Sequence, residues 1–227
     1  MVAVVVVRSP SKLSDLYMCI SANVSISTFV ISIISSLVLI YYGEPRWKTE
    51  NIIIGTFFIY VAIVQLLEWM MWVDLDGKIG INRVATLVTP IYVYVQPLVL
   101  YNIEAFLYGV VSPWWWLLVE FLYLIVTVLQ YREFVKGDVL VTKCGSGSAG
   151  GILDWVWVHY YNMVLYFGVF VFAIFAFMAT NIAMLCFIIG LAFLLLSIAK
   201  YGGHGSSFFC FISAFAPIAF LFGESFL

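Results

Sequence analysis

Charged side chains are scarce in this sequence, and their scarcity excludes most soluble folds. Only 10% of the 227 residues are Asp, Glu, Lys or Arg, whereas a soluble domain carries about a quarter. The ten basic residues are scattered, which excludes an extended nucleic-acid-binding surface. Hydrophobic residues make up 65% of the chain and occur in unbroken runs. Such runs indicate helices that span a lipid bilayer.

Cysteine and histidine are also few, and neither forms a recognisable motif. The four cysteines stand singly, with no Cys-x-x-Cys pair, and the simplest interpretation is three small buried side chains and one loop thiol. A zinc-dependent hydrolase normally uses three protein ligands and an adjacent acid or base. With only His159 and His204 in the chain, that enzyme class is a minor alternative.

The N-terminal apolar run, Met1 to Val7, does not have the pattern of a signal peptide. Its basic residues, Arg8 and Lys12, follow the apolar residues, whereas a signal peptide places the charge first. We expect the first span to act as its own insertion signal.

Seven apolar segments approach the length of about 20 residues that a helix needs to cross a bilayer. We therefore predict an all-α membrane protein, a seven-transmembrane helix bundle. The predicted spans are at about residues 20–42, 52–72, 84–108, 114–131, 157–178, 182–199 and 207–222. The third contains Pro90 and Gln96-Pro97, and since proline removes a donor and kinks a helix, we expect this span to be bent near its middle.

The longest predicted loop, residues 132–154, joins the fourth and fifth spans. Within residues 134–141, two short β-prone runs surround a Lys-Gly-Asp turn, so we expect a small β-hairpin there. Residues 144–151 are rich in Gly and Ser, which is typical of a flexible linker.

The distribution of Lys and Arg predicts the orientation. With seven spans, eight basic residues fall on the side of the N-terminus, and only Arg46 and Lys48 fall on the other side. Because basic residues favour the cytoplasmic side, we predict a cytoplasmic N-terminus and a C-terminus outside.

A carboxylate inside the second span is the leading candidate for a functional group. An ionisable side chain in a spanning helix costs a few kcal/mol or more, so Glu68 is a functional-site hypothesis. Gln65, Glu68, Trp69 and Trp72 have the spacing of a single helix face. In the alternative interpretation, a protonated Glu68 bonds to a backbone carbonyl or to Gln96 and only holds helices together.

Two functional classes follow from this group. The first is transport or channel-like handling of a proton, a cation or a small polar solute, with Glu68, Gln65, Trp69 and Trp72 beside a pathway and the Gln96-Pro97 kink supplying free carbonyls. The second is a non-catalytic scaffold or binding protein for lipid, pigment or partner helices, in an oligomer or a membrane complex.

A third class is a metal-binding membrane enzyme or sensor. The expected topology places Cys19, His159, His204 and Cys210 in one leaflet, where they form a ligand set for a soft metal. Capping or interfacial roles are the alternative for the two histidines. The sequence requires no cofactor, and a retinal protein is excluded because residues 207–222 contain no lysine for a Schiff base.

Three short patterns together resemble a known family. Met18-Cys19-Ile20-Ser21-Ala22 resembles a Met-Cys-Phe-Ser-Ala signature, and Gln65-Leu66-Leu67-Glu68-Trp69 with Trp72 resembles Gln-x-x-Glu-Gly-x-x-Trp. Ser207-Phe208-Phe209-Cys210-Phe211 resembles Ser-x-Trp-Cys-Phe-Phe. These signatures are similar to those of uncharacterised multi-span membrane proteins from bacteria, with divergent members in algae and giant viruses.

The resemblance implies a family core over residues 18–227 and an N-terminal extension over residues 1–17. It implies no activity. Trp69 stands where the family pattern has Gly, so we expect any shared pocket at this position to be reshaped.

Overall fold

Helices account for nearly all the regular structure of the described chain. The computed structural model describes residues 21–109, 113–137, 140–144, 153–201 and 206–224. Its α-helices are α1 (Ala22–Tyr42), α2 (Lys48–Val73), α3 (Ile81–Tyr94), α4 (Gln96–Tyr108), α5 (Trp114–Val135), α6 (Met163–Phe177), α7 (Thr180–Tyr201), α8 (Ser206–Ser213) and α9 (Ala216–Glu224). The smaller elements are the 3₁₀ turns η2 (Pro45–Trp47) and η3 (Val156–Tyr160) and the strands β1 (Lys143–Cys144) and β2 (Leu153–Asp154).

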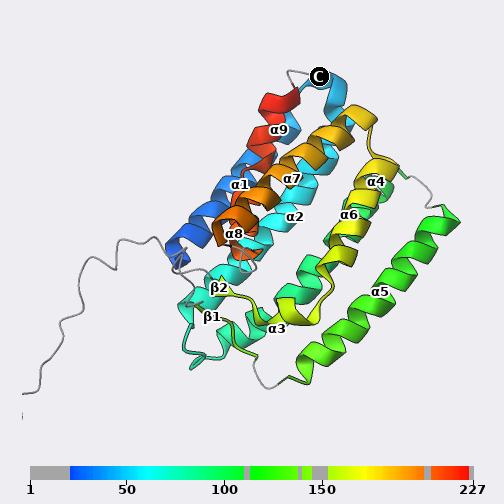
Figure 1. Cartoon of the computed structure of the whole chain (residues 1–227). Coiled ribbons are helices and arrows are strands. Elements are labelled where there is room, and N and C mark those ends of the chain that lie inside the picture. The colour runs from blue at the N-terminus through cyan, green and yellow to red at the C-terminus, as the bar shows by residue number, and fades with distance from the viewer. Residues whose placement is uncertain (1–20, 110–112, 138–139, 145–152, 202–205, 225–227) are drawn as a thin grey trace, which may run out of the picture.

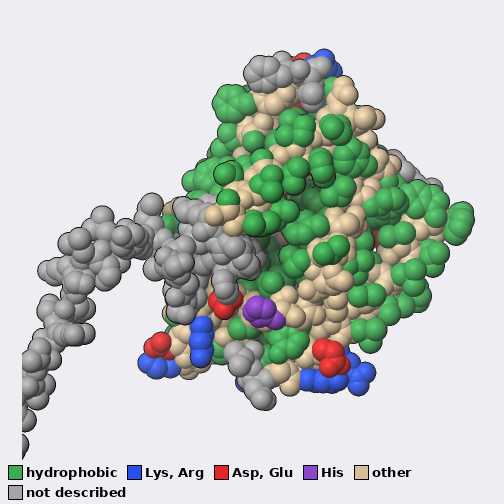
Figure 2. Space-filling view, in the orientation of Figure 1, with side chains coloured by type: hydrophobic (Ala, Val, Ile, Leu, Met, Phe, Trp, Pro, Cys, Tyr) green, Lys and Arg blue, Asp and Glu red, His purple; other side chains and the backbone are tan. Residues whose placement is uncertain are grey.

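Several of these helices are suited to a lipid bilayer. In the described part of the chain, four segments are long and apolar enough to cross a membrane: Ala22–Tyr42, Pro45–Val73, Trp114–Val135 and Thr180–Ala199. The bent pair α3–α4 makes a fifth if it is counted as one span. Figure 2 shows apolar side chains over the middle of the displayed face and charged side chains towards its two ends. The protein is therefore built as an integral membrane protein.

The helices lie roughly side by side in one bundle. Figure 1 shows α1 along one edge and α5 along the other, with α2, α6 and α7 between them. The α1 helix begins at one end of the bundle, and α9 ends at the opposite end. The end at which α1 begins also holds the α2–α3 connection, β1 and β2.

The bend expected in the third predicted span is present. The axes of α3 and α4 differ by 58°, and the break lies at Val95, just before Gln96-Pro97. Pro97 lacks an N–H and crowds the backbone of the preceding residue, which disfavours a continuous helix there. Pro90, in contrast, lies inside α3.

Two predicted spans have different boundaries from those expected. The fifth does not begin at residue 157, because residues 156–160 form η3 and α6 begins only after Asn162. The Asn162 side chain accepts a hydrogen bond from the backbone N–H of Leu165 at 3.0 Å, which caps the 15-residue helix. The seventh predicted span is divided into α8 and α9, and the break precedes Pro217.

The loop after α5 also differs from the expected hairpin. Phe134 and Val135, the first β-prone run, form the last turn of α5. Asp138 and Val139 lie outside the described residues. The antiparallel pairing joins β1 to β2 instead, with Lys143 opposite Asp154 and Cys144 opposite Leu153.

A buried polar network holds this loop against the α2–α3 connection. Asn82 donates from Nδ2 to the carbonyl oxygens of Met71 at 3.1 Å and Thr142 at 2.9 Å, and its Oδ1 accepts from the Thr142 N–H at 3.0 Å. The Asp74 carboxylate accepts from the N–H groups of Ile79 at 3.0 Å and Asn82 at 3.1 Å. Because Asn82 bonds both to Met71 on α2 and to Thr142 in the loop after α5, the network joins these segments at one end of the bundle.

The interface between α1 and α2, which we call the α1–α2 seam, is closely packed. Its α1 side consists mainly of small polar side chains, namely Ser25, Thr28, Ser32, Ser35 and Ser36. On α2, a Cβ atom added at Gly55 would lie 2.5 Å from Ile40 Cγ1 and 2.9 Å from the Ser36 carbonyl oxygen. The two backbones therefore approach so closely that only glycine fits at residue 55.

Candidate functional site

A largely aromatic cavity lies between α2, α4, α6, α7 and the α8–α9 pair. Its volume is about 90 Å³. Seven phenylalanines line it: Phe57, Phe58, Phe167, Phe170, Phe193, Phe209 and Phe220. No Asp, Glu, Lys, Arg or His is among the described residues of its walls. An ion would lose its hydration in this cavity without a compensating charge, so the lining favours an uncharged occupant.

The mouth of the cavity lies between α6 and α7. Phe167 and Phe170 on α6 and Ile189, Gly190 and Phe193 on α7 line the cavity and are only half-buried. In Figure 2 the displayed face is hollowed between these two helices. A Cβ atom added at Gly190 would meet no atom within 4 Å, so the space beside this glycine is open.

The surface around the mouth is apolar. Phe172 and Phe175 on α6 and Ile188 and Leu191 on α7 are all exposed, by 40% to 56%. In a bilayer these side chains contact lipid, and the mouth between them faces lipid as well.

Two helix breaks meet at the cavity. Gln96 is the first residue of α4, directly after the break at Val95. Ser213 is the last residue of α8, and Ala216 is the first of α9, on either side of the second break. All three residues line the cavity, although they come from two distant parts of the sequence.

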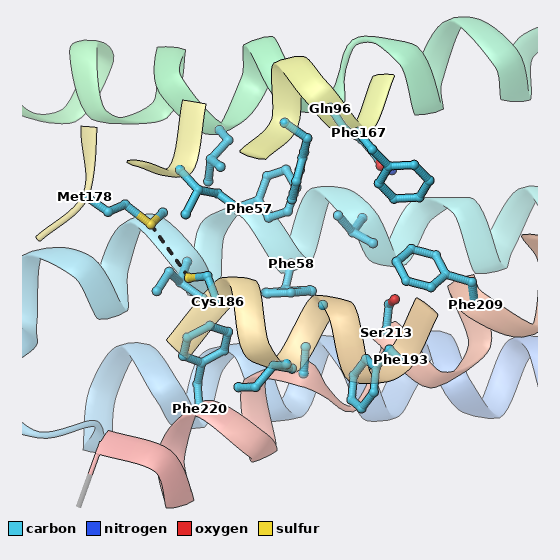
Figure 3. Close-up of a pocket in the computed structure, with 18 of the residues that line it drawn as sticks. Phe57, Phe58, Gln96, Phe167, Met178, Cys186, Phe193, Phe209, Ser213 and Phe220 are labelled. Atoms are coloured by element: carbon cyan, nitrogen blue, oxygen red, sulfur yellow. Dashed lines mark hydrogen bonds between the residues drawn. The ribbon is translucent and has the colours of Figure 1, made fainter. Parts of the chain in front are cut away.

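Few polar groups reach the cavity, and Figure 3 shows how they are arranged. The Tyr166 hydroxyl donates a hydrogen bond of 2.7 Å to Gln96 Oε1, and both residues are nearly fully buried. In Figure 3, Gln96 and Phe167 lie on one side, and Ser213 lies on the other. Met178 and Cys186 lie towards the opposite end, where the two sulfur atoms are 3.7 Å apart. One end of the cavity is therefore polar, and the other is apolar.

Glu68 and Gln65 lie in the interior of α2 but do not line this cavity. Glu68 is 0% exposed and Gln65 is 1% exposed. The Cys210 thiol on α8 is close enough to Glu68 for an electrostatic interaction. Neither the amide oxygen nor the amide nitrogen of Gln65 has a hydrogen-bond partner among the described residues. The Glu68 group is therefore a second polar location, distinct from the cavity.

The remaining residues of the predicted pathway are divided between these two locations. Trp69 and Trp72 are half-buried on α2, and Trp72 packs against the core cluster that contains Met71. Pro97 is buried beside Gln96 and causes the helix break that borders the cavity. The structure brings Gln96 to the cavity and leaves Glu68 outside its lining.

The predicted metal ligands are only partly described. Cys19 and His204 lie outside the described residues. His159 is exposed on η3, and Cys210 is half-buried against the core cluster. Within the described ranges, no three His, Cys, Asp or Glu side chains are grouped so that they could hold a metal ion.

Most residues of the cavity were not identified from the sequence. Phenylalanines within spans are ordinary lipid-facing or packing residues, so nothing in their pattern distinguishes those of the cavity. The sequence does contain one feature near Ser213 that indicates a helix break. This feature is Pro217, which follows Ser213 by four residues inside an apolar run. Such a proline indicates a break, as Pro97 does in the third predicted span.

With this geometry established, the chain can be compared with other proteins. No protein-family model, curated protein or solved structure matches it. The resemblance of the three short signatures to a bacterial family therefore stays a prediction.

Proposed function

We propose that this protein binds a small, uncharged, largely apolar molecule in the cavity whose mouth lies between α6 and α7. The observation that carries this proposal is the lining itself, which contains seven phenylalanines and no charged side chain among the described residues. Apolar pockets with a few polar groups are the usual form of small-molecule sites. The protein thus belongs to the binding class of membrane proteins, whose ligand is a lipid-like or pigment-like molecule.

The proposal includes a membrane topology. We propose seven crossings, made by α1, α2, α3–α4, α5, α6, α7 and α8–α9, with the N-terminus in the cytoplasm. The alternating direction of these elements in Figure 1 supports the count. The basic residues at the end of the bundle where α1 begins support the orientation, because basic residues beside spans favour the cytoplasmic side. They include Lys78 on the α2–α3 connection, Arg132 in the last turn of α5 and Lys136 directly after α5.

Photolabelling tests the binding proposal. The protein in lipid nanodiscs is irradiated with a small uncharged aryl diazirine, and the adducts are mapped by mass spectrometry. We expect adducts on Phe57 and Leu100, which line the cavity but are only 4% and 5% exposed. Lipid-facing residues of α5, such as Phe121, are labelled in any case and serve as the internal reference.

Two glycine variants give a matched pair for this test. Gly190→Leu adds a side chain at the mouth, whereas Gly168→Leu adds the same side chain at an exposed position of α6 that does not line the cavity. We expect Gly190→Leu to remove the adducts on Phe57 and Leu100, and Gly168→Leu to keep them. Wild-type protein labelled only on its outer surface would refute the proposal.

Transport is the second candidate function, and two observations favour it. Discontinuous helices that meet at one site are characteristic of secondary transporters, and here two breaks meet at the cavity. In addition, the fully buried Glu68 is the kind of intramembrane carboxylate that proton and cation pathways use. Proton flux into proteoliposomes, followed with an internal pH-sensitive dye, tests this function. Flux that is unchanged in Glu68→Gln would exclude Glu68 as the site.

A further inference from the structure

We infer that the ligand of this cavity carries one uncharged hydrogen-bonding group, an alcohol or a carbonyl, and that Gln96 and Ser213 recognise it. This inference rests on the proposed binding function and adds the chemical class of the ligand. The ligand is a molecule that is dissolved in the bilayer and enters the cavity between α6 and α7.

The Gln96 side chain is held in one orientation. Its Oε1 accepts the Tyr166 hydroxyl at 2.7 Å, and this bond is buried. A glutamine amide also carries two N–H donors on Nε2. Because the oxygen is engaged by Tyr166, the nitrogen is the group that Gln96 can offer to a ligand oxygen. The sequence supports this geometry, since Pro97 places Gln96 at the start of α4, where the helix is broken.

Ser213 supplies a second polar group in the cavity wall. Its side chain is 8% exposed and lines the cavity opposite Gln96 (Figure 3). A hydroxyl both donates and accepts. An alcohol or carbonyl oxygen between the two side chains is therefore able to bond with either. Both groups are neutral, so they do not compensate the charge of a carboxylate or an ammonium group.

The cavity is polar at one end and apolar at the other. Met178, Cys186 and Phe220 lie at the end away from Gln96 and Ser213 (Figure 3). A molecule with one polar group and one apolar body matches this arrangement. This cavity of about 90 Å³ is smaller than the apolar cavity of about 150 Å³ that holds benzene, so it accommodates a segment of the ligand and not a large ligand as a whole. The rest of a longer molecule extends between α6 and α7 into lipid.

Competition between three probes with the same chain length tests the inference. Nonan-1-ol, nonane and nonanoate at pH 8 are each added to the nanodiscs at equal mole fraction in the lipid. Their ability to reduce diazirine labelling of Phe57 and Leu100 is measured. A tenfold preference corresponds to about 1.4 kcal/mol, which is at the upper end of what one net hydrogen bond contributes. We expect nonan-1-ol to compete about tenfold better than nonane, and nonanoate to compete least.

Two glutamine variants make the test specific. Gln96→Leu should lower the preference for nonan-1-ol over nonane, and the double variant Gln96→Leu/Ser213→Ala should bring the ratio to about one, because Ser213 alone still offers a hydroxyl. Gln65→Leu is the matched control, since Gln65 is equally buried but does not line the cavity. It should keep the tenfold preference, and because the amide of Gln65 has no hydrogen-bond partner among the described residues, the protein should remain folded.

The outcomes separate this inference from the function on which it rests. If Phe57 and Leu100 are labelled but nonane or nonanoate competes as well as nonan-1-ol, the inference is wrong and binding in the cavity stands. If a tenfold preference persists in Gln96→Leu, recognition by Gln96 is wrong. If Phe57 and Leu100 are never labelled in wild-type protein, both the inference and the proposed function are wrong.

Discussion

The α1–α2 seam and the α6–α7 mouth are both interfaces between apolar helices, yet they are packed in opposite ways. In the seam, small side chains allow two backbones to approach until only a glycine fits at residue 55. At the mouth, the lining side chains of α6 and α7 include Phe167, Phe170 and Phe193, and Gly190 adjoins open space.

The difference shows how one bundle combines a rigid part with a binding site. Without water, helices in a membrane associate through close contact and hydrogen bonds, and small residues supply that contact. The seam and the nearby Asn82 network provide it for α1, α2 and α3. Large residues that cannot interdigitate leave a void, and a void is where a ligand binds.

Adding a larger side chain to the closely packed α1–α2 seam should produce the largest loss of stability. Gly55→Leu forces the added side chain against Ile40 and the Ser36 carbonyl, and overpacking of this kind costs about 3 kcal/mol. We expect a clear decrease in the free energy of unfolding in mixed micelles. Gly190→Leu and Gly168→Leu receive the same side chain where space is open, so neither should be destabilised. Equal losses in all three variants would contradict the contrast between seam and mouth.

Breaking the Asn82 network should be the next largest effect. Asn82→Ala removes the buried bonds from Nδ2 to the carbonyls of Met71 and Thr142 and the bond that Oδ1 accepts from the Thr142 N–H, whereas the backbone bond from residue 82 to Asp74 is retained. Unsatisfied buried groups cost about 1 to 3 kcal/mol, so we expect a loss of about 2 kcal/mol. The thermal midpoint in detergent measures it. Asn102→Ala, which breaks a partly exposed contact with Glu120, should lose less.

Removal of the Tyr166 hydroxyl should have a smaller effect. Tyr166→Phe deletes the bond to Gln96 Oε1 and should lower stability by about 1 kcal/mol. Tyr161→Phe is the control, because the buried Tyr161 hydroxyl has no hydrogen-bond partner among the described residues. The same thermal measurement applies. If the control loses as much as Tyr166→Phe, the Gln96–Tyr166 bond does not contribute to the fold.

Acid should lower the stability of the protein through Asp74, at the end of the bundle that holds the Asn82 network. The hydrogen bond from the Ile79 N–H is the main cause that lowers the pKa of Asp74, and the bond from Asn82 adds to it. A carboxylate with a lowered pKa in the folded state stabilises the protein above its unfolded pKa of about 3.9. That contribution disappears as the pH falls through the folded pKa. Thermal midpoints between pH 7 and pH 3 should therefore decrease below about pH 4, and by less in Asp74→Asn than in the wild type.

The sequence predicted the membrane class and much of the helical layout, because those features depend on local patterns. The end of α1 at Tyr42 follows from the apolar run, and the break before α4 follows from Pro97. The start of α6 was wrong, because Asn162 caps the helix later than the apolar run begins.

The cavity could not be predicted, because it depends on how distant segments pack. Gln96 was identified as a kink residue, but its contact with Tyr166 joins residues that are 70 positions apart. The same limit applies to Glu68. Its spacing with Gln65 predicted a shared face, and both side chains are buried, but the spacing did not indicate a cavity beside other helices.

The most direct test of the account is a crystal structure of the protein with 9-bromononan-1-ol, in which anomalous scattering locates the bromine. We expect one bromine peak among the phenylalanines of the cavity or at the mouth between Phe167 and Phe193, with the ligand hydroxyl within hydrogen-bond distance of Gln96 or Ser213. Bromine found only on the outer surface of the helices, with the cavity free of the probe, would contradict it.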